Sequence, residues 1–275
     1  MTKPIAIQGI KGSFHHEVAQ KYFSDNSEVV ECLSFDNAVE RLMLAEADYT
    51  VMALENSIAG SIIPNYALID AHNLKIIGEY YLDVQHNLMA LPEQSIKDIT
   101  EVRSHPMALL QCKTFFKNNP DIKLIETKDT AEVAKQIYDQ KIKGIAAIAS
   151  KTAANMYKLN VLAESIQSIK NNETRFVIVK RKKHKIERKA LNKASLKFEL
   201  DHKRGSLATT LNVMSDCKLN LTKIQSLPKI DTPWKYAFFV DVTFDSYEDY
   251  KKAISIIQLM AENFKVLGEY KNARL

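Results

Sequence analysis

The chain has few cysteines and no long apolar run. Three cysteines occur in 275 residues, and Cys32, Cys112 and Cys217 lie far apart, without the spacing of zinc ligands. Neither a disulfide framework nor a zinc site is predicted, and a reducing cytosol is favoured. No stretch approaches the ~20 consecutive apolar residues of a membrane span. Residues 1–7 lack the charged-then-apolar design of a secretion signal, so we expect a cytoplasmic protein without membrane contact.

Positive charge is concentrated in one place. Much of the net charge of +5 comes from the basic run at Lys180–Lys185. Nucleic-acid phosphates could bind such a run, but no interleaved aromatic residues or groove-reading helix accompany it. We interpret it as a solvated linker, residues 181–193, and expect no nucleic-acid partner. Because single cores usually cover roughly 100–200 residues, the linker predicts two domains, 1–180 and 194–275.

Residues 1–180 alternate short apolar runs with helical periodicity, which is typical of an α/β domain. Polar residues repeatedly stand where a strand ends or a helix begins, at Ser13, Ser34, Asn56, Ser104, Asp129 and Ser150. In α/β domains, ligands gather at the carboxyl ends of strands and at helix N-termini, whose free N–H groups favour anions. This pattern predicts a site for a small anionic ligand.

Residues 194–275 follow a different pattern. A half-buried strand is predicted from the alternation over residues 195–200. It is followed by a helix, two strands, a helix and a strand, at residues 207–214, 220–224, 236–244, 250–261 and 265–270. This βαββαβ order predicts a ferredoxin-like module, a fold that by itself says little about function.

Motifs for nucleotides and metals are missing. Gly9 and Gly12 do not complete a GxGxxG fingerprint, and no phosphate-loop pattern occurs. His15 and His16 are adjacent, so on a helix they point to different faces, and no partners stand at metal-ligand spacing. We therefore expect no metal and no other cofactor.

Two serines and a histidine are candidate site residues. Ser57 and Ser104 could each be a nucleophile, but neither lies in a G-x-S-x-G elbow, and each is placed as a helix cap or anion-binding residue. His105 could be a general base, or a structural residue between a cap and a proline. The sequence alone leaves both roles of His105 open.

Arg175 is the most informative single residue. It stands before the apolar run Phe176–Val179, which predicts a central strand, and a guanidinium at the mouth of such a strand needs an anionic partner. That partner is either a buried carboxylate of the protein or a substrate. We favour the substrate, because the polar cluster Asn172–Arg175 directly precedes a core strand.

Six segments form an ordered set of motifs along the chain. They are Gly9–Phe14 (GIKGSF), Glu55–Gly60 (ENSIAG), Ser104–Cys112 (SHPMALLQC), Asp129–Ala134 (DTAEVA), Ala146–Ser150 (AAIAS) and Asn172–Phe176 (NETRF). In order and spacing they resemble the prephenate dehydratase family, and residues 194–275 resemble its C-terminal ACT regulatory domain. The resemblance implies a two-lobed catalytic domain, like periplasmic ligand-binding proteins. One lobe would hold residues 1–80 and the strand from Phe176, the other residues 82–165, with the substrate in the cleft.

The resemblance implies conversion of prephenate into phenylpyruvate, with loss of carbon dioxide and water, in phenylalanine biosynthesis. The ring becomes aromatic, so no electron sink, metal or cofactor is required. The enzyme must orient the substrate, anchor its surviving carboxylate and help the hydroxyl depart. The motifs assign departure to Thr174, bidentate carboxylate anchoring to Arg175 and ring packing to Phe176. Further substrate contacts are expected from Asn56, Ser57, Ser104, His105, Gln111, Thr130 and Asn172.

The resemblance to an ACT domain implies phenylalanine as a feedback effector and a homodimer or homotetramer formed through these domains. The effector-binding residues would be Gly205, Ser206, Leu207, Asn220, Leu221, Gln225 and Ser226. Gln225 and Leu227 depart from the family's Glu-Ser-Arg-Pro pattern and remove a carboxylate and a guanidinium, which argues against tight control. Two other functions stay open: an arogenate dehydratase, whose substrate differs by one amino group, and a non-catalytic cytosolic amino-acid sensor.

Overall fold

The computed structural model describes residues 4–23, 27–181, 191–201, 203–229 and 235–274. Most of the predicted linker, residues 182–190, lies outside these ranges. The chain divides into two compact units. Unit 1 contains Met1–Gly60 and Leu82–Thr174, and unit 2 contains Ser61–Tyr81 and Arg175–Leu275. Packing thus groups Ser61–Tyr81 with the strand from Phe176, as the expected lobe does, and adds the C-terminal module to them, which the sequence did not indicate. The domain boundaries at 180 and 194 stay a prediction.

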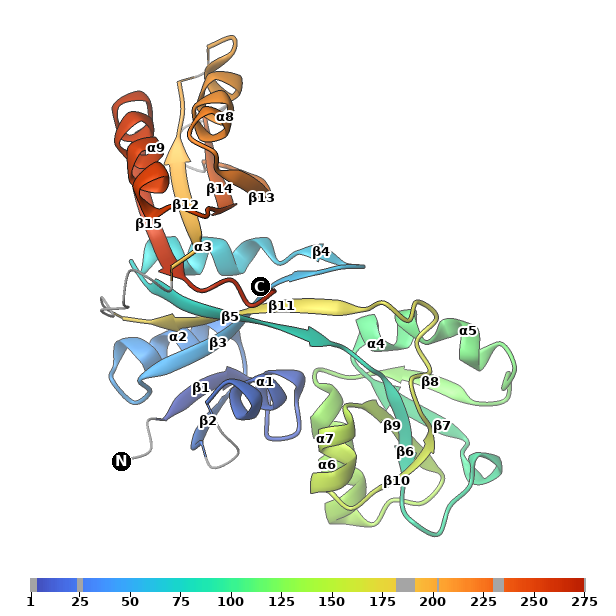
Figure 1. The fold of residues 1–275 in the computed structure, drawn as a ribbon. Coiled ribbons are helices and arrows are strands. Elements are labelled where there is room, and N and C mark those ends of the chain that lie inside the picture. Colours follow the sequence, from blue (N-terminus) through green and yellow to red (C-terminus); the bar gives the residue numbers. More distant parts are fainter. Residues whose placement is uncertain (1–3, 24–26, 182–190, 202, 230–234, 275) are drawn as a thin grey trace. The chain divides into compact units, whose positions relative to one another are not determined.

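Unit 1 is built from two sheets with flanking helices, as far as its described residues show (Figure 1). Its elements are β1 (Ile5–Gln8), α1 (Phe14–Phe23), β2 (Val29–Cys32), α2 (Phe35–Met43), β3 (Tyr49–Asn56), β6 (Asn87–Ala90), the 3-10 helix η1 (Ile96–Asp98), β7 (Glu101–Ser104), α4 (Pro106–Gln111), α5 (Lys113–Phe116), β8 (Lys123–Glu126), α6 (Thr130–Gln140), β9 (Ile145–Ala149), α7 (Lys151–Met156) and β10 (Asn160–Ala163). Strand β1 pairs in parallel with β2 and β3. The second sheet has the order β10-β6-β9-β7-β8, with β7, β8 and β9 parallel and β6 and β10 antiparallel. The predicted α/β class is confirmed.

Side-chain caps set the starts of several helices in unit 1. Ser34 Oγ accepts a hydrogen bond from Asn37 N at 3.2 Å, and Asp129 Oδ1 accepts one from Ala131 N at 2.7 Å. Each cap satisfies a backbone N–H that has no partner within the first helical turn. The predicted starts of α2 and α6 are therefore confirmed.

Apolar cores lie on both faces of the second sheet, which explains the unbroken apolar run of β9. Ala147 and Ala149 pack with residues of α6 and α7, whereas Ala146 and Ile148 pack with residues of α4 and α5. Successive side chains on a strand point to opposite faces, so a strand covered on both sides is apolar throughout. Across the described ranges, no helix has the length and apolar character needed to cross a membrane.

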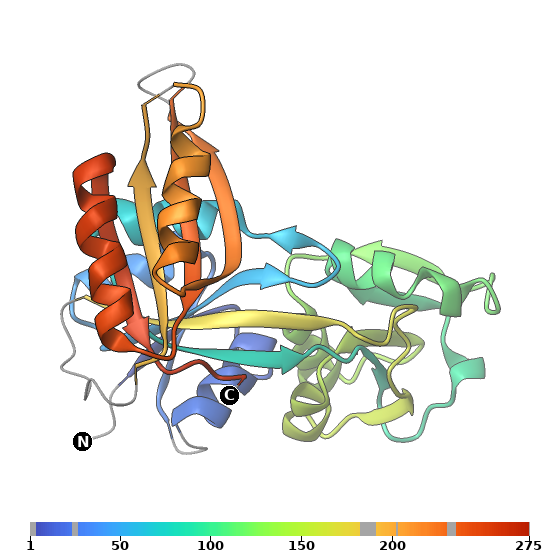
Figure 2. The same ribbon diagram turned by 45° about the horizontal axis from the view of Figure 1, so that its top comes forward.

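Unit 2 contains the predicted βαββαβ module. Its elements are α3 (Ile63–Ala71), β12 (Lys193–Glu199), α8 (Ser206–Asp216), β13 (Asn220–Pro228), β14 (Tyr236–Thr243), α9 (Tyr247–Met260) and β15 (Glu262–Tyr270), while β4 (Gly60–Ser61), β5 (Lys75–Asp83) and β11 (Glu173–Lys180) each run across a boundary between the units. The strands take the order β13-β14-β12-β15, with antiparallel pairing throughout. Both helices cover the same face of this sheet (Figure 2). This confirms the ferredoxin-like prediction.

The module is continued by β5 and β11, which follow β15 in the sheet order of unit 2. Gly268 on β15 pairs with Ile76 on β5, and a Cβ at Gly268 would lie 2.2 Å from the carbonyl oxygen of Ile76. Only glycine allows the two backbones to approach this closely. The sheet therefore joins the C-terminal module to the strand that carries Arg175.

Candidate active site

Asn56, the last residue of β3, is the centre of a hydrogen-bond network in unit 1. Its Nδ2 donates to Asn172 Oδ1 at 2.7 Å and to Thr174 Oγ1 at 2.8 Å. Its Oδ1 accepts from the backbone N–H groups of Ile58 and Ala59 at 3.0 and 2.8 Å. The turn after β3 thus fixes which end of the Asn56 amide faces Thr174. The Thr174 oxygen is held as an acceptor, and its hydroxyl hydrogen stays available for another group.

Asn172 connects this centre to helix α4. It is fully buried, and its Nδ2 donates to Oε1 of Gln111, the last residue of α4, at 2.9 Å. The structure therefore brings together four of the residues that the sequence singled out, Asn56, Gln111, Asn172 and Thr174. In each of these amides the oxygen accepts a hydrogen bond, so the donors run in one direction, from Asn56 through Asn172 to Gln111.

Ser57 holds the backbone at the start of β11 through hydrogen bonds. Its Oγ accepts from Glu173 N at 3.0 Å and donates to Asn171 O at 3.3 Å. Ser57 N also donates to Glu173 O at 2.8 Å. The prediction that Ser57 caps a helix is wrong, because it lies in a turn and positions the segment that carries Asn172 and Thr174.

Ser104 ends strand β7 elsewhere in unit 1, while His105 and Thr130 lie at the starts of α4 and α6. Ser104 is fully buried and donates to Ile148 O at 2.7 Å. The cap of α4 is His105, whose Nδ1 accepts from Met107 N at 3.2 Å, so the prediction that Ser104 is the cap is wrong. Thr130 is the first residue of α6, behind its cap Asp129. No hydrogen bond joins these three side chains to Asn56 or Asn172 within the described part of the chain.

The Arg175 guanidinium is surrounded by hydrogen-bond partners from unit 2. It is 4% exposed, its Nε donates to Glu79 Oε2 at 2.7 Å, and its two terminal nitrogens donate to Asp241 and to Tyr270 Oη. All three guanidinium nitrogens are thus engaged by the protein. This geometry matches the buried ion pair that the sequence left open, and it corrects the expectation of a bidentate substrate anchor.

The charges around Arg175 balance. Lys193 Nζ donates to both oxygens of Glu79 at 3.0 and 2.9 Å, so two cations face two carboxylates. Burial raises the pKa of Asp241, but the nearby Arg175 charge and the Ser195 hydrogen bond outweigh it and hold that pKa below its ordinary value. Asp241 therefore stays ionised, as a neutral cluster requires.

Strand geometry explains why the consecutive side chains of Thr174, Arg175 and Phe176 have different surroundings. Consecutive residues of an extended strand point to opposite faces. Thr174 bonds to Asn56, whereas Arg175 bonds to Glu79. Phe176 is 2% exposed and belongs to the buried core, so its ring is not open to a substrate as we had expected.

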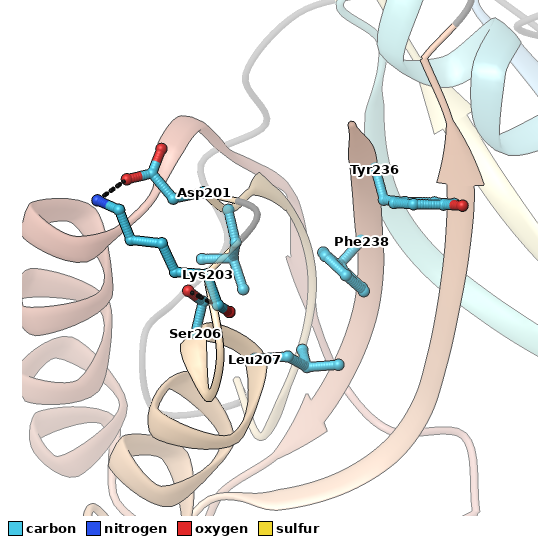
Figure 3. Close-up of a pocket in the computed structure, with 7 residues that line it drawn as sticks. Asp201, Lys203, Ser206, Leu207, Tyr236 and Phe238 are labelled. Carbon is cyan, nitrogen blue, oxygen red and sulfur yellow. Dashed lines mark hydrogen bonds and ion pairs between the residues drawn. The ribbon is translucent and has the colours of Figure 1, made fainter. Parts of the chain in front are cut away.

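A pocket of about 140 Å³ lies in the C-terminal module of unit 2. Its lining residues are Leu200, Asp201, Lys203, Ser206, Leu207, Tyr236 and Phe238 (Figure 3). Gly205 precedes it as the cap of α8, in the left-handed conformation at φ 81°. Two predicted effector residues, Ser206 and Leu207, line this pocket.

The other predicted effector residues, Asn220, Leu221, Gln225 and Ser226, lie on β13 and do not line the pocket. The exposure of β13 alternates along the strand, because one face of its sheet is covered and the other is open. Among the residues described, no group of three or more histidine, cysteine, aspartate or glutamate side chains is placed to hold a metal ion.

Comparisons with known proteins agree with these motifs. Residues 5–184 match the family described as prephenate dehydratase. The chain is 36% identical over 277 residues to arogenate dehydratase/prephenate dehydratase 2, chloroplastic, of Arabidopsis thaliana, covering 97% of this chain and 72% of that protein.

Solved structures share the fold. A prephenate dehydratase from Arthrobacter aurescens in complex with L-Phe superposes with a TM-score of 0.87, at 24% identity, covering 98% of this chain and 90% of that one. A quorum-quenching acylase, GqqA, superposes with a TM-score of 0.89, at 23% identity, covering 98% of each chain. At these identities the two likenesses show the fold alone. The match over residues 5–184 and the identity to the Arabidopsis protein show that the chain belongs to the prephenate dehydratase family.

Proposed function

We propose that this protein is a prephenate dehydratase, which releases carbon dioxide and water from prephenate to give phenylpyruvate in phenylalanine biosynthesis. Family membership over residues 5–184 supports this proposal. The structural observation that carries it is the Thr174 hydroxyl. Its oxygen accepts from Asn56 Nδ2 at 2.8 Å, and its hydrogen has no partner within the described residues.

The proposed reaction is a single redistribution of electrons. The bond between the ring and the departing carboxylate breaks, its electron pair enters the ring, and the bond to the ring hydroxyl breaks as the ring becomes aromatic. Thr174 donates a hydrogen bond to the departing oxygen. As charge builds on that oxygen, Asn56 Nδ2 stabilises the partial charge passed to Thr174 Oγ1. A threonine hydroxyl is a weak acid, so this role is charge stabilisation, and the proton that completes the water comes from solvent.

Gln111 is the clearest further substrate contact in this proposal. Its Oε1 is occupied by Asn172 and His86, whereas its Nε2 donates no hydrogen bond to any described residue. An amide N–H in the same hydrogen-bond network as Thr174 suits a carboxylate or carbonyl oxygen of the substrate. His105, Ser57, Ser104 and Thr130 stay proposed contacts through the N–H groups of the segments in which they lie.

The choice of substrate is tested by comparing kcat/KM for prephenate and arogenate. We expect prephenate to be preferred, with phenylpyruvate as the product. A higher kcat/KM for arogenate, with phenylalanine as the product, would instead make the protein an arogenate dehydratase. If neither substrate gave a product, the non-catalytic sensor would be the better description.

We further propose that phenylalanine is an effector and binds weakly at the pocket next to Ser206. The Arthrobacter aurescens protein was crystallised with L-Phe, which supports an effector of this class. In this chain the pocket offers an apolar wall from Leu207 and Phe238 and a charged pair, Asp201 and Lys203, at its edge. An amino acid with an apolar side chain suits that combination.

Titration calorimetry with phenylalanine tests this proposal. Heat is expected at millimolar phenylalanine, because Gln225 and Leu227 remove charged groups that the family pattern supplies. Ser206→Tyr places a ring in the pocket and should abolish the heat. Ser215→Tyr adds the same ring at an exposed site on the same helix and should leave the heat unchanged. Absence of heat from the parent protein at millimolar phenylalanine would refute the effector.

Assembly and location belong to the same proposal. We propose a homodimer or homotetramer formed through the C-terminal modules, in the cytoplasm. Strand β13 supports this, because among the described strands it pairs only with β14 and leaves its other edge open to a second chain.

A further inference from the structure

His86 is a buried histidine that no motif singled out. It lies in the segment between β5 and β6 and is 4% exposed. Its Nε2 is 2.8 Å from Gln111 Oε1, and the Phe14 ring packs edge-on against it with centroids 5.7 Å apart. Its Nδ1 is also buried and has no hydrogen-bond partner within the described residues. A lone histidine before a short strand gives no sequence signal, so only its contacts reveal it.

The network identifies which nitrogen of His86 carries the hydrogen. Gln111 Oε1 already accepts from Asn172 Nδ2 at 2.9 Å, and an amide oxygen can only accept. His86 Nε2 therefore donates to Gln111. The orientation of Asn172 is set in turn by Asn56, whose own amide is fixed by the turn after β3.

The unpartnered Nδ1 indicates that His86 is neutral. An imidazolium would bury a second N–H without an acceptor, which is costly. Burial also lowers the pKa of His86, and the hydrogen bond to Gln111 only partly opposes it. The ring is therefore the neutral tautomer with hydrogen on Nε2.

We propose that His86 is a positioning residue for the reaction. Its Nε2–H holds Gln111 Oε1 as an acceptor and turns the Gln111 amide so that its Nε2 is free. The same contact gives the last acceptor of the network a second donor, whereas the turn after β3 fixes the Asn56 end, which leaves the Thr174 hydroxyl hydrogen available. Without that donor, Gln111 Oε1 keeps only the hydrogen bond from Asn172 Nδ2, so a single contact holds the Gln111 amide in place. This inference rests on the proposed function, since it assigns the free groups of Gln111 and Thr174 to a substrate.

The first test is a pair of substitutions in the full chain. His86→Leu removes the donor, whereas His86→Gln restores an N–H at about the same reach. We expect His86→Leu to lower kcat about 10-fold with KM little changed, because the lost order affects the transition state more than binding. His86→Gln should recover most of kcat at an unchanged melting temperature. Equal losses in both variants, or a His86→Leu variant within two-fold of the parent, would overturn the proposal.

A double substitution tests whether His86 acts through Gln111. In a Gln111→Met background, His86→Leu should have no further effect on kcat, because the acceptor that His86 positions is already gone. Losses that simply multiply would refute this coupling.

Nitrogen NMR of the imidazole provides a measurement that does not depend on activity. We expect hydrogen on Nε2 and a bare Nδ1 for His86 across neutral pH, and hydrogen on Nδ1 would contradict the proposal. If the parent protein formed no product from prephenate or arogenate, the proposed function would fail. The NMR result would still report on the tautomer, so the two failures are distinguishable.

Discussion

Replacement of Thr174 by valine is expected to lower kcat by ~10²-fold or more. Valine keeps the shape of threonine and removes only the hydroxyl that would face the departing oxygen. Asn56 Nδ2 loses one acceptor but keeps Asn172 Oδ1 at 2.7 Å. The free energy of unfolding should therefore fall by only about 1 kcal/mol. Steady-state kinetics with prephenate measure kcat, and thermal denaturation of the same preparation measures the change in the free energy of unfolding.

Thr174→Ser is the matched control, because serine keeps the hydroxyl and loses only a methyl group. Its kcat should stay within about 10-fold of the parent, since a serine side chain has more rotational freedom than a β-branched one. A valine variant with turnover within a few-fold of the parent would contradict the proposed role of the hydroxyl. A large loss in the serine variant would instead attribute the effect to packing.

Local patterns were sufficient to predict most elements of the fold. The alternation of residues 195–200 and 236–244 places strands β12 and β14, and Asp129 begins α6, because period and cap chemistry act over a few neighbouring residues. The grouping of Ser61–Tyr81 with the C-terminal residues depends on contacts such as Gly268 with Ile76, which are almost 200 positions apart. No local pattern encodes such a contact.

The candidate site, like the fold, was predicted from the sequence only in part. Asn56, Gln111, Asn172 and Thr174 were named through the ordered motifs, and the structure joins them by hydrogen bonds. His86 was missed because one histidine outside any motif has no characteristic spacing. Ser104 was assigned the cap that His105 provides, since a histidine nitrogen can accept from the helix as a serine oxygen does.

Arg175 shows how one local pattern can have two physical causes. A guanidinium at the start of a core strand indicates an anionic partner, and the pattern does not distinguish a substrate from a carboxylate of the protein. The partners Glu79 and Asp241 are 96 and 66 positions away in the chain. The alternation of β11 turns Arg175 away from the face that Thr174 occupies. Thr174 therefore takes part in the proposed chemistry, whereas the next residue, Arg175, belongs to the core of unit 2.

Replacement of Arg175 by methionine is consequently expected to destabilise the protein by about 3–5 kcal/mol, because it leaves buried carboxylates short of one positive charge. Lys193 can neutralise Glu79, but among the described residues the Asp241 carboxylate would then keep only one hydrogen-bond partner, the neutral Ser195 hydroxyl. Urea denaturation measures the loss.

Two further variants separate a structural Arg175 from a substrate anchor. Arg175→Met combined with Asp241→Asn removes both charges and should recover part of the lost stability, as expected for a pair whose desolvation is costly. Arg41→Met breaks the exposed contact with Glu46 and should change the urea midpoint little. If Arg175→Met instead left the urea midpoint unchanged and raised KM, the guanidinium would bind substrate and the buried ion pair would not be its main role. The expected loss of stability, with KM preserved in whatever folded protein remains, follows from three guanidinium nitrogens that already have partners inside unit 2.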